Sequence, residues 1–163
     1  MLGNKIVLTP EPRGRRIEGV IETALYPGTV VQVKPGSELD AGNRLTWRAF
    51  DASGSGAPGL IGVLDFDWQQ GKTYAEPYVA GRRGFIYFPL PGDELNMLIA
   101  DLAGTGATSD FSVGDLLMVQ DGTGLLIDAG IGTAQYTSRP FMAHENYSDM
   151  VGNTLLHVMF TGY

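Results

Sequence analysis

The sequence contains no cysteine among its 163 residues. This absence excludes disulfide bonds, zinc sites built on thiolates and catalysis by a thiol nucleophile. Long hydrophobic runs are also missing, because no stretch approaches the roughly 18 apolar residues of a membrane-spanning helix. The apolar piece Ile6 to Leu8 is too short for a secretory signal and is followed by Pro10 and Pro12. We therefore expect a soluble protein, made in a cytoplasm, with no membrane partner.

Positive charge is scarce, since 11 Lys and Arg stand against 18 Asp and Glu and give a net charge of −7. Residues 1–16 carry four basic residues against Glu11, or +3, so the remaining chain carries −10. An acidic body argues against a nucleic-acid partner, because affinity for nucleic acids comes largely from neutralising phosphates. The basic N-terminal segment is suited instead to an acidic partner surface.

Gly (23) and Pro (9) make up about a fifth of the chain and interrupt it every several residues, which favours short strands joined by turns. Alternating or β-rich runs predict strands at 29–33, 44–50, 60–66, 84–88, 116–120, 125–128 and 155–160. Residues 93–102 have apolar spacing that fits a helix, but a strand after the Pro91-Gly92 turn fits as well, and the glycine-rich context favours the strand. The prediction is an all-β fold with little helix.

The chain is long enough for one hydrophobic core, with 44% hydrophobic residues, but too short for two ordinary domains. Residues 1–19 are expected to form an extended arm, because Pro10, Pro12 and Gly14 break any helix. Residues 20–163 are expected to form a single β-rich domain. Loops of small residues are expected at 51–59 and 104–110.

Motifs for cofactor binding and catalysis are weak. The G-x-G-x-x-G spacing at residues 54–59 contains Pro58 and precedes a strand, whereas nucleotide binding needs a helix there. His144 has no second histidine four residues later, and His157 lies in an apolar strand, so neither belongs to a zinc-protease motif. No serine is marked as a nucleophile by a G-x-S-x-G sequence. We expect no enzyme activity, no cofactor and no metal ion.

The carboxylates of Asp65 and Asp67, with Glu76 nearby, raise the alternative of a hard-metal site. Asp65 and Asp67 alternate with Phe66 and Trp68. This alternation is typical of a half-buried strand whose acidic side faces water. The interpretation as a solvated strand face is therefore favoured over a metal site.

Most aromatic side chains are expected in the core, where they supply much of the packing of a small β domain. The segment from Trp68 to Tyr78, which includes Lys72 and Tyr74, is the part most readily placed at a subunit interface. If Trp47 and Trp68 were exposed side by side, they would form a sugar-stacking platform instead.

Several turn-and-strand motifs follow one another in a particular order. They are Tyr26–Val31, Leu60–Leu64, Trp68 with Gln70–Thr73, Tyr78–Gly81, Pro89–Asn96, Val113–Val119, Gly122–Leu126 and Val158–Tyr163. This order resembles the head-decoration (cement) proteins that reinforce the capsids of tailed bacteriophages. The resemblance covers about residues 20 to 163 and includes no catalytic residue, because the family acts through its surfaces.

The resemblance implies a compact β-barrel-like or β-tulip domain that binds the outer capsid surface of a virion, often as a homotrimer. Its partners would be the major capsid protein and further copies of itself. Binding only the mature lattice would stabilise the head against internal DNA pressure by mass action. The arm would add a strand to a neighbour and form ion pairs with an acidic capsid surface. The residues of this hypothetical capsid-binding arm are Ile6, Val7, Leu8, Arg13, Arg15 and Arg16.

Two alternatives stay open from the sequence. The first is a virion-associated carbohydrate- or receptor-binding module that uses exposed Trp47 and Trp68. The second is a small β-barrel hydrolase, which needs a cleft where His144 or His157 converges with carboxylates.

Overall fold

The computed structural model describes residues 6–8, 14–51, 60–66, 73–100, 110–128, 140–148 and 154–162. These residues form ten strands and no helix, which confirms the predicted all-β fold. The strands are β1 (Arg15–Ile21), β2 (Val30–Val33), β3 (Thr46–Ala49), β4 (Ile61–Asp65), β5 (Arg83–Phe88), β6 (Glu94–Leu98), β7 (Leu116–Val119), β8 (Leu126–Asp128), β9 (Phe141–Ala143) and β10 (Leu155–Phe160). Within the described ranges, no helix has the length and hydropathy needed to cross a membrane.

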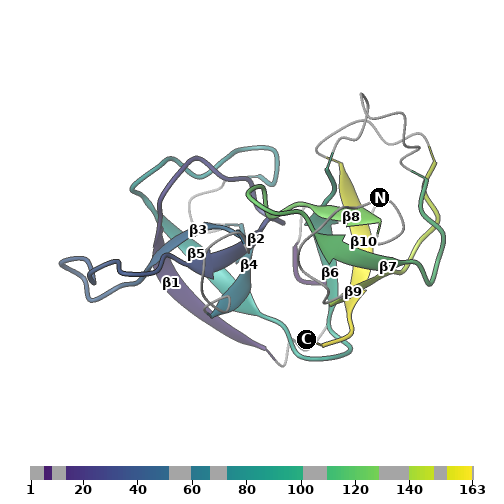
Figure 1. The fold of residues 1–163 in the computed structure, drawn as a ribbon, viewed down its shortest axis with the longest axis horizontal. Coiled ribbons are helices and arrows are strands. Elements are labelled where there is room, and N and C mark those ends of the chain that lie inside the picture. The colour runs from purple at the N-terminus through teal and green to yellow at the C-terminus, as the bar shows by residue number, and fades with distance from the viewer. Residues whose placement is uncertain are drawn as a thin grey trace.

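The strands form two sheets that follow each other along the chain. The first five close into a barrel in the order β1-β3-β2-β4-β5. The last five form a second sheet, called the open sheet below, in the order β6-β10-β9-β7-β8, and a parallel bridge between Ile99 and Leu126 joins its two outer strands. Figure 1 shows the barrel on the left and the open sheet on the right. The pairing of β1 with β3 is parallel, and the other strand pairs are antiparallel. The barrel closes through the long β1–β5 ladder, which runs from Arg15 opposite Phe88 to Val20 opposite Arg83.

Alternate residues of the barrel strands point inward and fill the barrel. This inner core contains Ile21, Val31, Trp47, Leu64, Tyr78 and Ile86. The indole of Trp47 is fully buried and lies against Gly19 of β1, where a Cβ atom would come within 2.2 Å of the indole Cδ1. Glycine at position 19 therefore leaves the space that the largest side chain of this core occupies.

The residues that flank the inner core positions point outward and pack against the open sheet. Val30, Val63 and Tyr87 belong to a second core cluster that also contains Leu95 and Phe141 of the open sheet. Strands β2, β4 and β5 thus bury side chains on both faces, so their sequences do not alternate strictly between apolar and polar residues. The barrel and the open sheet share one core.

The chain passes from the barrel to the open sheet through a turn held by a buried carboxylate. The Tyr87 hydroxyl donates a hydrogen bond of 2.6 Å to Asp93 Oδ2, and the Leu90 N–H donates one of 2.8 Å to the same oxygen. The Gly14 N–H donates to the Tyr87 hydroxyl oxygen at 3.0 Å. Asp93 is fully buried. This network connects β5, the start of β6 and the residue before β1.

The strands predicted from the sequence are present, with bounds that differ by at most two residues. Residues 93–102, which fitted a helix or a strand, contain the strand β6. Two strands were not predicted, β1 and β9. Residues 15–19 were expected in an extended arm, but they belong to β1 because pairing with β5 satisfies their backbone groups. The predicted loops at 51–59 and 104–110 lie almost wholly outside the described residues.

Candidate functional site

The N-terminal apolar segment pairs with β6 of its own chain. Val7 forms an antiparallel bridge with β6, the Leu8 N–H donates to the Glu94 carbonyl at 2.9 Å, and the Asn96 N–H donates to the Ile6 carbonyl at 2.7 Å. Ile6 is fully buried in the shared core. These residues were expected to extend a neighbour's sheet. In this structure they cover the edge of β6, which would otherwise present unpaired backbone groups.

Arg16, expected to contact the capsid, is engaged within the barrel. Its Nε lies 3.2 Å from Asp65 Oδ2, its Nη2 donates to the Phe66 carbonyl at 3.0 Å, and its guanidinium lies 4.2 Å from the Phe85 ring centroid. Asp65 is 7% exposed, so the expectation that it faces water is wrong. Burial raises the pKa of the Asp65 carboxyl, while Arg16 and the Phe66 N–H oppose that rise. Arg15 is exposed on the same strand.

The predicted interface residues separate in the structure. Tyr74 is half-buried and packs against the shared core. Tyr78 is only 3% exposed, and its hydroxyl donates to the Asp65 carbonyl at 2.8 Å. Tyr78 is therefore a core residue of the barrel, and its assignment to an interface is wrong. The other predicted site residues lie outside the described part of the chain: Arg13, Trp68 and Lys72.

One of the two tryptophans of the predicted sugar-stacking platform is not at the surface. Trp47 is fully buried in the barrel and meets Phe88 edge to face, with 5.7 Å between ring centroids. A platform for a sugar ring needs an exposed aromatic face. The hypothesis of a binding site formed by Trp47 and Trp68 is therefore wrong.

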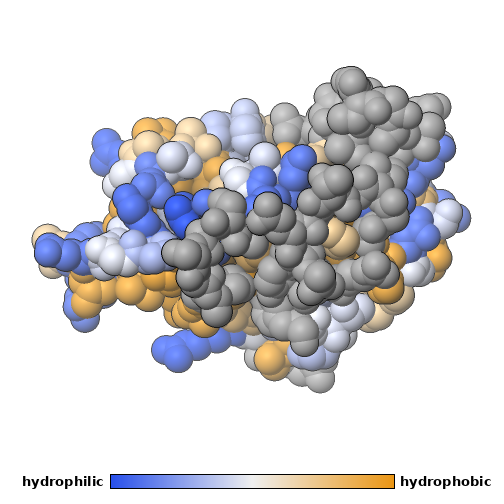
Figure 2. Space-filling view, in the orientation of Figure 1, coloured by the Kyte–Doolittle hydropathy of each residue, from blue (hydrophilic) through white to orange (hydrophobic). Residues whose placement is uncertain are grey.

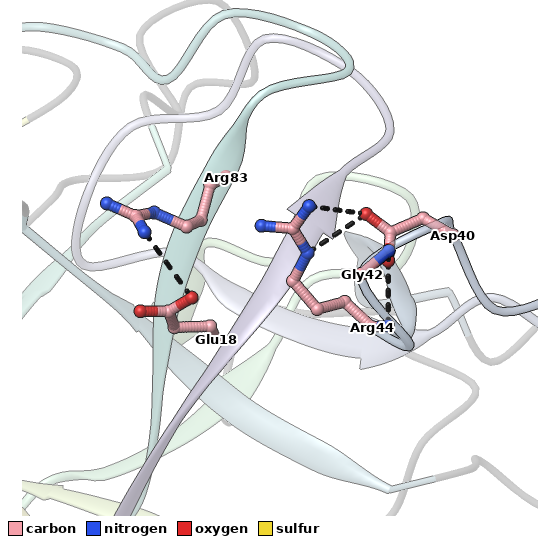
Figure 3. Close-up of polar contacts among 5 residues, drawn as sticks. All are labelled: Glu18, Asp40, Gly42, Arg44 and Arg83. Atoms are coloured by element: carbon pink, nitrogen blue, oxygen red, sulfur yellow. Dashed lines mark hydrogen bonds and ion pairs between the residues drawn. The ribbon is translucent and has the colours of Figure 1, made fainter.

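Charged groups at one end of the barrel pair with each other. Asp40 Oδ1 accepts hydrogen bonds from the backbone N–H groups of Gly42 and Arg44, and Asp40 Oδ2 accepts one of 2.9 Å from Arg44 Nε (Figure 3). The Arg44 side chain lowers the pKa of Asp40, and Asp40 raises that of Arg44. Glu18 and Arg83 form a neighbouring pair at 3.5 Å. These contacts order the loop before β3 and indicate a structural role.

A group of ionisable side chains on the open sheet was not predicted. Glu94 begins β6, His157 lies in β10, and His144 follows β9 directly. His157 Nε2 lies 3.1 Å from Glu94 Oε2, and His144 Nδ1 lies 4.0 Å from Glu94 Oε1. The two imidazole rings are nearly perpendicular, with 4.9 Å between centroids. Sequence spacing could not reveal this group, because the register of three strands creates it.

Charge is divided unequally between the two halves of the chain. Residues 1–88, which include the barrel, contain ten Lys and Arg against nine Asp and Glu, a net charge of +1. Residues 89–163, which include the open sheet, contain one Arg against nine Asp and Glu, a net charge of −8. The open-sheet half therefore attracts cations, and the barrel half is nearly neutral.

Comparison with known proteins identifies a shared fold. No family model matches the sequence, and no curated protein sequence matches it. Among solved structures, the chain is similar to the N base of head fiber gp8.5 in bacteriophage phi29, with a TM-score of 0.51 and 9% sequence identity. The similarity covers 91% of this chain and 94% of that chain. The two proteins thus share one fold over nearly their whole lengths.

Proposed function

We propose that this chain is a structural protein of a phage virion, which binds the outer surface of the capsid and stabilises the mature head. The observation that carries the proposal is the shared fold with the N base of a phage head fiber, because it extends over 91% of this chain and includes both sheets. In this role the chain has no catalytic activity and needs no cofactor.

The motif order that resembles head-decoration proteins supports the same function. Pro89–Asn96 contains the buried turn that leads into β6, and Val113–Val119 contains β7. Tyr26–Val31 leads into β2, which packs against the open sheet through Val30. The motifs therefore coincide with turns and strands of the fold, and the resemblance and the structural similarity both favour a protein of a phage head.

The surface is suited to contacts with other proteins. Eight large apolar side chains of the described residues are at least 36% exposed, and Figure 2 shows apolar residues in orange among hydrophilic residues in blue on the face in view. They are Tyr26, Leu39, Leu60, Val79, Leu90, Val113, Leu116 and Tyr147. Single exposed apolar side chains are normal on protein surfaces, and those that a partner covers would favour association because they leave water. We expect them to contribute to contacts with the major capsid protein and between the subunits of a homotrimer.

The charge division favours one orientation on the capsid. An acidic lattice would repel the open-sheet half, with its net charge of −8, more than the barrel half. We therefore expect the barrel half to face the capsid, with Arg15 among its contacts. Many copies bound to one lattice would stabilise it even if each contact is of modest strength.

Binding to heads tests this proposal directly. Heads of the virus that encodes the chain are prepared without it, mixed with purified protein at micromolar concentration and sedimented. We expect saturable binding and a higher temperature of head disruption. Neutralising Arg15 (Arg15→Gln) should weaken binding severalfold at low salt, whereas Asp110→Asn in the open-sheet half should not. Absence of saturable binding at micromolar protein would refute the proposal.

A further inference from the structure

Three potential metal ligands converge on the outer face of the open sheet. Strand β10 lies between β6 and β9, so it places His157 next to Glu94 on one side and His144 on the other. The His144 N–H donates to the His157 carbonyl at 2.9 Å, which makes these residues cross-strand neighbours. Alternation along the strands directs all three side chains away from the shared core. The candidate ligand atoms all lie within 4.8 Å of one another.

We propose that Glu94, His144 and His157 form a binding site for a divalent transition-metal ion of the zinc type. Two imidazoles and one carboxylate are a ligand set that zinc accepts in proteins, with water at the fourth position. Zinc bonds of about 2.0–2.1 Å require ligand atoms roughly 3.3 Å apart in a tetrahedral arrangement. His157 Nε2 lies 3.1 Å from Glu94 Oε2, close to this spacing, whereas His144 Nδ1 lies 4.0 Å from the other carboxylate oxygen, Oε1. A modest shift of His144 and of the Glu94 carboxylate would bring the three ligand atoms onto one ion.

The burial of the three side chains fits this small adjustment. The side chain of His157 is 14% exposed, whereas those of His144 and Glu94 are 38% and 39% exposed. His157 is held by its surroundings, and the Glu145 carboxylate accepts a hydrogen bond of 2.8 Å from its backbone N–H. One ligand is therefore preorganised, and the two more exposed side chains can rotate toward a bound ion.

Two further features concern the cation at this position: one attracts cations in general, and the other selects among them. The open-sheet half has a net charge of −8, which raises the local concentration of cations. In addition, the strand register places Met159 opposite both Glu94 and Met142, on the same face as the histidines. Imidazole and thioether groups are poor ligands for Mg²⁺ and Ca²⁺, which prefer oxygen. The site should therefore discriminate between zinc and these hard cations.

A bound ion would connect three strands of the open sheet. Glu94 belongs to the edge strand β6, which also holds residues 6–8, and the histidines belong to β10 and to the residue after β9. The unfolded chain does not preassemble these ligands, so binding stabilises the folded state. This role is independent of the capsid function proposed above, and either inference can fail without the other.

Isothermal titration calorimetry of ZnCl₂ into the full chain, free of any histidine tag, tests the site. We expect one zinc ion per chain and no saturable heat with MgCl₂. The variants His144→Ala and Glu94→Gln should each weaken zinc binding at least tenfold, since each removes one of three ligands. Glu76→Gln, which neutralises an exposed glutamate in the barrel half, should leave the zinc affinity unchanged.

A second measurement separates loss of the site from loss of the fold. In NMR spectra of the unmodified chain, zinc should shift the ring signals of both histidines together, and the melting temperature should rise. In folded His144→Ala, zinc should shift the His157 ring signals only at concentrations at least tenfold higher. The proposal is overturned if the dissociation constant of zinc for the unmodified chain exceeds 100 µM, which corresponds to a binding free energy of about −5.5 kcal/mol. It is also overturned if His144→Ala binds zinc as tightly as the unmodified chain.

Discussion

The buried hydrogen bond between Tyr87 and Asp93 gives a quantitative test of how the two sheets are joined. The change Tyr87→Phe removes one hydroxyl and keeps the ring in the shared core. It removes the 2.6 Å hydrogen bond to Asp93 Oδ2 and leaves the Gly14 N–H without this acceptor. Asp93 Oδ1 already has no hydrogen-bond partner in the described structure, so the carboxylate would keep only the Leu90 N–H as a donor there.

The expected cost follows from the charge and burial of the acceptor. A hydrogen bond to a charged group contributes about 1.5–3 kcal/mol, more than one between neutral groups. Asp93 is fully buried, so water cannot replace the lost hydroxyl without rearrangement. For a chain of this size, each kcal/mol lowers the melting temperature by about 2–4 °C. Tyr87→Phe should therefore lower it by about 3–12 °C.

Urea denaturation at neutral pH measures the change in the free energy of unfolding. The exposed Tyr26 provides the matched control, because Tyr26→Phe should change stability by less than about 0.5 kcal/mol. A double-mutant cycle with Asp93→Ala isolates the interaction, and a coupling energy of about 1–3 kcal/mol is expected. A coupling energy near zero would mean that this hydrogen bond does not hold the turn, contrary to our reasoning.

Two further predictions concern the backbone and a buried charge. Gly124 has φ +69°, and a Cβ atom there would come within 2.1 Å of the Val30 carbonyl oxygen, whereas Gly122 has φ +75° and open space around it. In urea denaturation, Gly124→Ala should therefore lower the free energy of unfolding by about 1–3 kcal/mol more than Gly122→Ala. Equal losses in the two variants would contradict this. Burial raises the pKa of Asp65 in the folded state above its value in the unfolded chain. Protonation of Asp65 therefore contributes stability at low pH, and this contribution is lost as pH rises. Asp65→Asn removes that pH dependence. The denaturation midpoint of the variant, relative to that of the unmodified chain, should therefore increase from about pH 4 to pH 7. A difference that stays flat or decreases would show that Arg16, and not burial, dominates the pKa of Asp65.

The strands that could be predicted are those whose local sequence pattern matches the burial of their residues in the fold. Residues 155–160 alternate between half-buried and buried positions, and they form β10 with the predicted bounds. Strand β1 was missed because its outward-facing charges and Gly19 hide the apolar positions, and its stability comes from six paired residues on β5. Strand β9 is only three residues long, too short for any periodicity to appear.

The residues assigned to function depend on information that the sequence pattern lacks. Asp65 was placed in water by alternation, but Arg16 of β1 reaches across β5 and covers it. Tyr78 was placed at an interface, but the closed barrel takes it into the core. The cluster of His144 and His157 with Glu94 requires the register of β6, β9 and β10. Each outcome was decided by long-range strand pairing, which local sequence does not specify.

The docking of residues 6–8 onto β6 also constrains the order in which the chain can fold during synthesis. Strands β1 to β5 can close the barrel as soon as residue 88 has left the ribosome, because the pairs that close it all lie before that position. Leu8 cannot find its hydrogen-bond partner until Glu94 has followed. At synthesis rates of about 5–20 residues per second, the 94 − 8 = 86 residues from Leu8 to Glu94 take about 4–17 seconds, so the N-terminal segment stays undocked while the barrel strands are being made. Its attachment to β6 is then among the steps by which the open sheet is added to the barrel.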